Sequence, residues 1–175
     1  MINYYLLRHS KAGFHEDDLK KPLSEMGLIR AEQMNEKLAD IKFDLVLYSK
    51  AIRTQQTGDI ICRDEDVPRK LVPSLYAPLD LGDAAIIKRS VAEVRSSVPR
   101  AYLESKYADT WEKFANHVAM EVQNLIEAEN AKKILIISHA IIINLLGSRL
   151  AESQKEKLLD LEIKACMGFK VNSAG

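Results

Sequence analysis

Two kinds of segment alternate along the chain, short apolar runs and longer stretches with helical spacing. Apolar runs that lack the alternation of a half-exposed strand are typical of strands buried on both faces of a parallel sheet. Such runs predict strands at residues 2–7, 43–48, 69–72 and 133–138, and one or two more within residues 161–171. The run at 133–138, with Ile-Leu-Ile-Ile before a serine, is the clearest of them.

Between these runs, apolar residues recur at the spacing of a helix face. This spacing predicts helices at residues 51–62, 81–94, 108–129 and 140–150, and another that begins after Ser24. Ser24 is expected to cap that helix. Its apolar positions are Met26, Ile29, Met34 and Leu38. The stripe from Trp111 to Ile126 is expected to face the core, and the stretch with Ser96, Ser97 and Pro99 is expected to be a loop or bend.

Strands that alternate with helices indicate an α/β fold, here a three-layer α/β/α sandwich with a mainly parallel central sheet. The chain has 175 residues, enough to bury a real core, and shows no repeat, low-complexity tract or linker. We therefore expect a single domain over residues 1–175, with a helical insert around residues 81–132. That insert would form either a lid or a wall that determines specificity.

Composition and charge narrow the function classes. The chain carries 25 basic and 25 acidic residues, and this balance disfavours a nucleic-acid-binding surface. The N-terminus lacks the pattern of a signal peptide, and the longest apolar run is interrupted by Ser138, His139 and Asn144, so no membrane partner and a cytoplasmic location are expected. Cys62 and Cys166 form no CxxC pair and are expected to be small core residues.

Polar residues with recognisable chemistry follow three of the predicted strands. The first strand leads into Arg8 and His9, the second into Ser49 with Arg53 one helical turn later, and the strand at 133–138 into His139. Ligands of open α/β sheets bind at the carboxyl ends of the strands. If these strands are neighbours, two arginines and two histidines meet at one edge of the sheet.

These residue types suit phosphoryl chemistry. Arginine matches phosphate oxygens with a charged fork, and a neutral imidazole keeps a lone pair for attack on phosphorus. A second histidine can donate a hydrogen bond to the phosphoryl oxygens as charge shifts in the transition state. His15 and His117 are expected to stay outside the site, and Ser49 is expected to cap the helix that carries Arg53.

In their order, these segments resemble the histidine phosphatase superfamily, which has the phosphoglycerate mutase-like fold. The motifs are Arg8-His9, a "S-x-x-x-R-x-x-Q-T" segment at residues 49–57, and Ser138-His139. Residues 18–27 are similar to the "D-x-x-R-P-L-T-x-x-G" of SixA-type phosphohistidine phosphatases. The resemblance covers roughly residues 2–150.

The resemblance implies a role for each matched residue. His9 would be the nucleophile that carries the transient phosphoryl group, Arg8 and Arg53 would bind phosphate, and His139 would stabilise the transition state. No metal and no other cofactor is implied. Two departures add candidate phosphate ligands: Ser10 stands where many members have glycine, and Lys21 replaces an arginine.

A third departure concerns the general acid. The mutase-like branch carries a glutamate in a "L-x-E" segment, and Ala77 stands at the matching position here. Loss of a positioned acid costs about 10²–10⁴ in rate when the leaving group is poor. Ala77 therefore favours a phosphoramidate or an activated ester, while Asp80 and Asp83 are candidates to supply the proton.

The sequence thus predicts a metal-independent phosphatase with a phosphohistidine intermediate, whose substrate is a phosphorylated protein, such as a phosphohistidine protein, or a small phosphorylated metabolite. The alternatives are a small-molecule phosphomonoesterase or phosphoglycerate mutase-like enzyme, and a non-catalytic phosphate-binding module.

Overall fold

The computed structural model describes residues 1–63, 66–76 and 84–173. Its centre is a five-stranded sheet in the order β3-β2-β4-β1-β5. The strands are β1 (Asn3–Arg8), β2 (Leu45–Tyr48), β3 (Arg69–Leu71), β4 (Lys133–Ser138) and β5 (Gly168–Asn172). All neighbouring pairs are parallel except β1 with β5, which confirms the mainly parallel sheet.

Helices lie close to the predicted positions. They are α1 (Glu25–Leu38), α2 (Ile52–Ile61), α3 (Ala84–Val94), α4 (Arg100–Leu103), α5 (Ala108–Glu129), α6 (Ala140–Leu150) and α7 (Lys155–Leu159), with 3-10 turns η1 (Asp18–Lys20), η2 (Pro73–Leu75) and η4 (Glu152–Gln154). The predicted cap is present, since the Ser24 hydroxyl accepts a hydrogen bond from the Gly27 N–H. Helix α4 falls where the sequence suggested a loop or bend.

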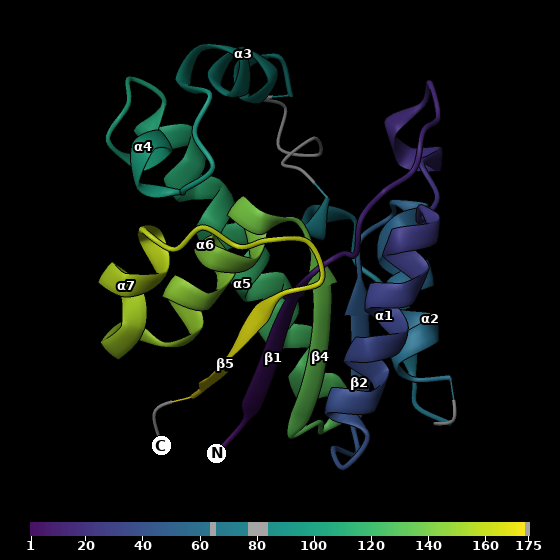
Figure 1. Ribbon diagram of the computed structural model, residues 1–175. Coiled ribbons are helices and arrows are strands. Elements are labelled where there is room, and N and C mark those ends of the chain that lie inside the picture. The colour runs from purple at the N-terminus through teal and green to yellow at the C-terminus, as the bar shows by residue number, and fades with distance from the viewer. Residues whose placement is uncertain (64–65, 77–83, 174–175) are drawn as a thin grey trace.

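The two faces of the sheet are covered by different helices, which gives three layers (Figure 1). Along β4, Ile134 and Ile136 join a core cluster with residues of α5 and α6. Leu135 and Ile137, which point the other way, join a second cluster with residues of α1 and α2. Because residues 134–137 of β4 are buried against helices on both faces, this strand is a continuous apolar run in the sequence.

Helix α1 packs against the rest of the molecule through small residues as well as through part of its large apolar side chains. Met26 and Ile29 are 47% and 51% exposed, whereas Gly27 and Ala31 are buried. A Cβ atom at Gly27 would lie 2.1 Å from the carbonyl oxygen of Lys11. This close approach of backbone to helix turns the small-residue face inward, so Met26 and Ile29, two of the apolar positions in the helical pattern, are left exposed.

Beyond the carboxyl ends of the parallel strands lie α3 and α4, above the sheet in Figure 1. They belong to the segment predicted as a helical insert. The apolar stripe of α5 is buried as predicted, from Trp111 to Ile126. Both Cys62 and Cys166 are buried, as the sequence predicted. Within the described ranges, no helix is long and apolar enough to cross a membrane.

Candidate active site

The pairing of β1 with β4 brings the two histidines together. In this register Arg8 is opposite Ser138, so His9 and His139 both follow at the same edge of the sheet. The His9 backbone N–H donates to the Ser138 carbonyl at 2.9 Å. The two imidazole rings meet edge to face, with their centroids 5.0 Å apart. Residues separated by 130 positions thus form one wall of a site.

Arg53 comes to the two histidines from the side of β2, the strand that pairs with the other edge of β4. Helix α2 begins at Ile52, just after β2, and Arg53 is 6% exposed on its first turn. Its Nε donates a hydrogen bond to Nε2 of His9 at 3.2 Å. The buried guanidinium therefore lies directly against the imidazole.

The surroundings of His9 determine both its protonation and its tautomer. Burial lowers the pKa of His9 to about 4; the hydrogen bond to the Ser10 backbone opposes this, and the Arg53 and Arg8 charges reinforce it. Nδ1 lies 2.6 Å from the Ser10 carbonyl oxygen, which can only accept, so Nδ1 carries the proton. Nε2 then holds a lone pair at neutral pH. This neutral imidazole is suited to attack phosphorus.

Arg8 has a buried donor that no group among the described residues satisfies. Its Nη1 donates to the Ile163 carbonyl at 2.6 Å, whereas the buried Nε has no hydrogen-bond partner within residues 1–63, 66–76 and 84–173. Burial lowers the pKa of Arg8 from its ordinary value, but an arginine pKa lies so high that the charge is kept. A buried cationic donor without a partner is costly unless an anion satisfies it. This observation points to a site for an anionic oxygen next to His9.

His139 is held by Ser49, whose Oγ lies 3.2 Å from Nε2 of the ring. Burial, aided by the neighbouring His9 and Arg53, lowers the pKa of His139 well below its ordinary value, so this ring is also neutral. Ser49 does not cap α2 as predicted. The helix begins after Ala51, two residues beyond Ser49, and the Ser49 hydroxyl lies instead between Thr54 and His139.

Asp18, on turn η1, ties several polar side chains to the site. Its Oδ2 accepts hydrogen bonds from Nη2 of Arg53 at 2.9 Å and from the Tyr76 hydroxyl at 2.8 Å, and its Oδ1 lies 2.9 Å from Nζ of Lys21. Burial alone would raise the pKa of Asp18, but these three partners hold it well below its ordinary value. Burial and the Asp18 carboxylate raise the pKa of Tyr76 to about 12. Asp18 is therefore a permanent anion beside Arg53.

Sequence reasoning assigned no role to Asp18 or Tyr76. Two features of the sequence could have drawn attention to them. Asp18 is the first residue of the segment similar to the SixA-type motif, and Tyr76 lies in the segment compared with "L-x-E". Neither pattern by itself indicates a contact with Arg53. Those contacts join residues 35 and 58 positions from Asp18.

The other predicted site residues have different fates. Lys21 is joined to the site through its ion pair with Asp18. Ser10 is fully buried and its hydroxyl donates to the Gly27 carbonyl at 2.7 Å, so the geometry does not support the predicted contact of Ser10 with phosphate. Asp80 and Asp83 lie outside the described residues. Among the residues that the structure does describe, no group of three or more His, Cys, Asp or Glu is placed to hold a metal ion.

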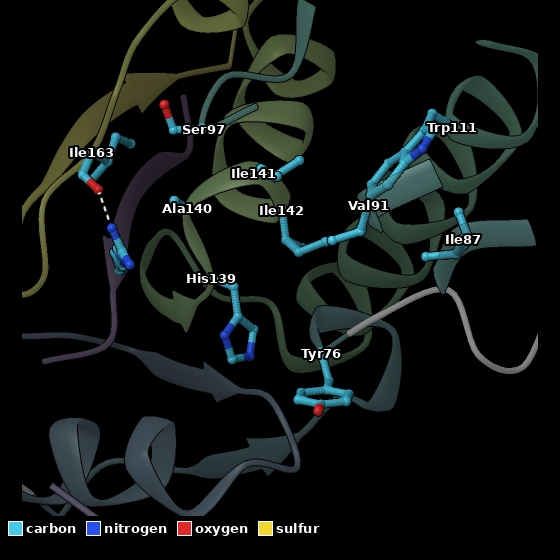
Figure 2. Close-up of a pocket in the computed structure, with 11 residues that line it drawn as sticks. Tyr76, Ile87, Val91, Ser97, Trp111, His139, Ala140, Ile141, Ile142 and Ile163 are labelled. Carbon is cyan, nitrogen blue, oxygen red and sulfur yellow. Dashed lines mark hydrogen bonds between the residues drawn. The ribbon is translucent and has the colours of Figure 1, made fainter. Parts of the chain in front are cut away.

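Two hollows open beside His139. One, of about 560 Å³, is lined by Asp18, Arg53, Tyr76 and His139 together with residues of α3. The other, of about 320 Å³, is lined by Arg8, Tyr76 and His139 and by apolar residues (Figure 2). Because both hollows share Tyr76 and His139, they adjoin each other at the carboxyl edge of the sheet.

The chain belongs to the histidine phosphatase superfamily (branch 1), whose family model matches residues 4–172. It is 24% identical over 160 residues to the adenosylcobalamin/alpha-ribazole phosphatase of Escherichia coli (strain K12), a match that covers 85% of this chain and 79% of the relative. The crystal structure of the alpha-ribazole phosphatase from Shigella flexneri is similar with a TM-score of 0.68 at 22% identity, covering 98% of this chain and 90% of that one. The protein histidine phosphatase SixA complexed with tungstate is similar with a TM-score of 0.63 at 18% identity, covering 94% and 84%.

These similarities confirm the family, the α/β fold and the enzyme class predicted from the sequence, a phosphatase that acts on phosphorylated substrates. At such identities the solved structures establish the fold, and the choice of substrate has to be argued from the site of this chain.

Proposed function

We propose that this phosphatase transfers the phosphoryl group of its substrate to Nε2 of His9 and from there to water, without a metal ion. The observation that carries the proposal is the state of His9. Its pKa is about 4, its Nδ1 proton is held by Ser10, and Arg53 lies against its Nε2. A neutral nucleophile beside two fixed cations suits an anionic phosphoryl group.

In the first step the phosphoryl oxygens take the place of His9 Nε2 as acceptors for the Arg53 guanidinium, while Nε of Arg8 donates to them as well. The Nε2 lone pair then forms the N–P bond as the bond from phosphorus to the leaving group breaks, and the leaving atom departs with that electron pair. His139, whose ring lies edge to face with that of His9 at 5.0 Å, would donate to the phosphoryl oxygens.

In the second step water attacks phosphorus from the side that the leaving group vacated. The O–P bond forms, the N–P bond breaks, and its electron pair returns to Nε2 of His9, while the water proton passes to solvent or to a base. Inorganic phosphate leaves and the neutral imidazole is restored. Arginine charge supplies in both steps the stabilisation that other phosphatases take from metal ions.

The leaving atom also needs a proton when it is an alkoxide. Asp18 does not provide it, because its pKa is held so low that it stays ionised. Asp80 and Asp83 remain the candidates that the sequence proposes for this role.

For the substrate we favour a phosphomonoester of a small molecule. The curated relative from Escherichia coli is named for a small-molecule substrate, and the 320 Å³ hollow beside His139 falls within the size range of small-molecule sites. A phosphohistidine protein is the second candidate, supported by the SixA-like segment that begins at Asp18. A purely phosphate-binding role is disfavoured because Arg8, His9, Arg53 and His139 are all intact.

The test is phosphate release from p-nitrophenyl phosphate and from a phosphohistidine peptide in excess EDTA. We expect turnover by the wild type and by His117→Ala, a control histidine on α5, and none by His9→Ala. Rapid acid-free quenching of the wild type should trap an acid-labile phosphoryl group that is missing in His9→Ala. Retained turnover in His9→Ala, or complete loss of turnover in EDTA, would refute the proposal.

A further inference from the structure

The 320 Å³ hollow lies next to the proposed phosphate site. It shares Arg8 and His139 with that site, and Tyr76 with the hollow that contains Arg53. Figure 2 shows the rings of His139 and Tyr76 at one end and the side chains of Val91 and Trp111 at the other. The leaving group of a substrate whose phosphoryl group is bound beside His9 therefore lies next to this hollow.

The lining of the hollow is mainly apolar. Its large apolar side chains are Ile87, Val91, Trp111, Ile141, Ile142 and Ile163. Among the described residues that line it, Arg8 is the one with a formal charge, and that guanidinium belongs to the phosphate site. Trp111 donates its indole N–H to the Ser90 hydroxyl at 2.9 Å, so the polar group of the indole is already satisfied.

Most of the apolar side chains that line the hollow are held by packing. Trp111 is 3% exposed, and its ring lies 4.8 Å from that of Tyr102 and 6.0 Å from that of Phe114. Ile87 and Ile142 are also buried. A rigid apolar wall around a volume at the small end of ligand sites is complementary to a compact ring system.

We propose that this hollow binds the leaving group and that the preferred substrates are phosphomonoesters whose leaving group carries a flat, uncharged ring system. The inference rests on the proposed function and names its substrate class. Such a ring removes its apolar surface from water on binding, whereas a carboxylate or a second phosphate would be desolvated with Arg8, already assigned to the phosphoryl group, as the one cation among the described lining residues. A protein segment would place unsatisfied backbone groups against the same apolar wall.

The experiment compares kcat/KM for phenyl phosphate, 2-naphthyl phosphate and 4-carboxyphenyl phosphate, whose leaving atoms are all phenolic oxygens. We expect naphthyl phosphate to exceed phenyl phosphate by at least about tenfold, because the second ring buries further apolar surface. The carboxyphenyl ester should fall below phenyl phosphate by at least about tenfold, because its charge is desolvated.

A matched pair of variants tests whether the preference arises in this hollow. Val91 lines it and is 46% exposed on α3, so Val91→Asp should be tolerated by the fold while it lowers the naphthyl-to-phenyl ratio toward unity. Ala92→Asp adds the same charge at the next, exposed position, which does not line the hollow, and should keep the ratio.

The possible results separate this inference from the proposed function. His9-dependent turnover with no preference for naphthyl phosphate, or with a higher kcat/KM for phosphoserine or a phosphohistidine peptide, overturns the inference alone. An unchanged ratio in Val91→Asp also overturns it. Absence of His9-dependent turnover of every ester overturns the proposed function and the inference with it.

Discussion

The low pKa of His9 makes the folded state sensitive to acid in a defined pH window. The pKa of His9 is about 4 in the folded protein, against 6.5 for an unperturbed histidine, and the residue is 9% exposed. Between these values the unfolded chain binds a proton that the folded chain does not, so stability falls as the pH is lowered. The stability that the folded state owes to a neutral His9 is present in full above pH 6.5 and is lost progressively as the pH falls to 4.

The magnitude follows from the same two values. Each pH unit in the window removes up to about 1.4 kcal/mol, so His9 accounts for about 3 kcal/mol over the whole window and about 2 kcal/mol between pH 7 and pH 5. Asp18 does not contribute there, because its lowered pKa places its own effect below the ordinary value of 3.8. His139, whose pKa is also lowered by burial, adds a loss of the same sign.

The assay is urea unfolding at pH 7 and pH 5 in phosphate-free buffers, since bound phosphate would itself stabilise the folded state. His9→Asn removes the titrating ring and keeps an amide that can donate to the Ser10 carbonyl. This variant should lose about 2 kcal/mol less than the wild type over the interval, whereas His117→Asn should behave like the wild type. Equal losses in the wild type and His9→Asn would show that His9 is not held neutral by its surroundings.

Three further predictions concern single side chains of the site and its support. Asp18→Asn removes the anion beside Arg53, so inorganic phosphate should inhibit competitively with a Ki lower by about tenfold; an unchanged or higher Ki would contradict this. Arg8→Lys keeps a charge but loses the fork, so kcat/KM should fall by about 10²–10³ in steady-state assays, and a loss under threefold would count against Arg8 as a phosphate ligand. Gly27→Ala places a Cβ atom 2.1 Å from the Lys11 carbonyl oxygen and should lower the free energy of unfolding by about 1–3 kcal/mol; an unaltered urea midpoint would mean that α1 shifts without cost.

Local patterns in the sequence were enough to place the elements and the chemistry that follows them. Helix and strand periodicity depends on neighbouring residues, which is why the strand at 133–138 and the cap at Ser24 appear in the structure where they were predicted. The order of the motifs indicated the family, because each lies at the end of an element that the local pattern already marks. The positions of His9, Arg53 and His139 along the chain needed no tertiary information.

Contacts between distant segments were decided by tertiary packing. The sheet order places β1 beside β4, and this turns two separate histidines into one site. The same long-range packing pairs Asp18 with Arg53. It also brings Trp111, which the helix pattern marks only as a core residue, into the wall of a hollow. Periodicity reports which face of an element is buried, but the identity of the neighbour on that face depends on how all the layers fit together. The sequence by itself therefore determined the reactive groups, and the tertiary structure alone decided the protonation of His9, the ionised Asp18 beside Arg53 and the apolar surroundings of the proposed leaving group.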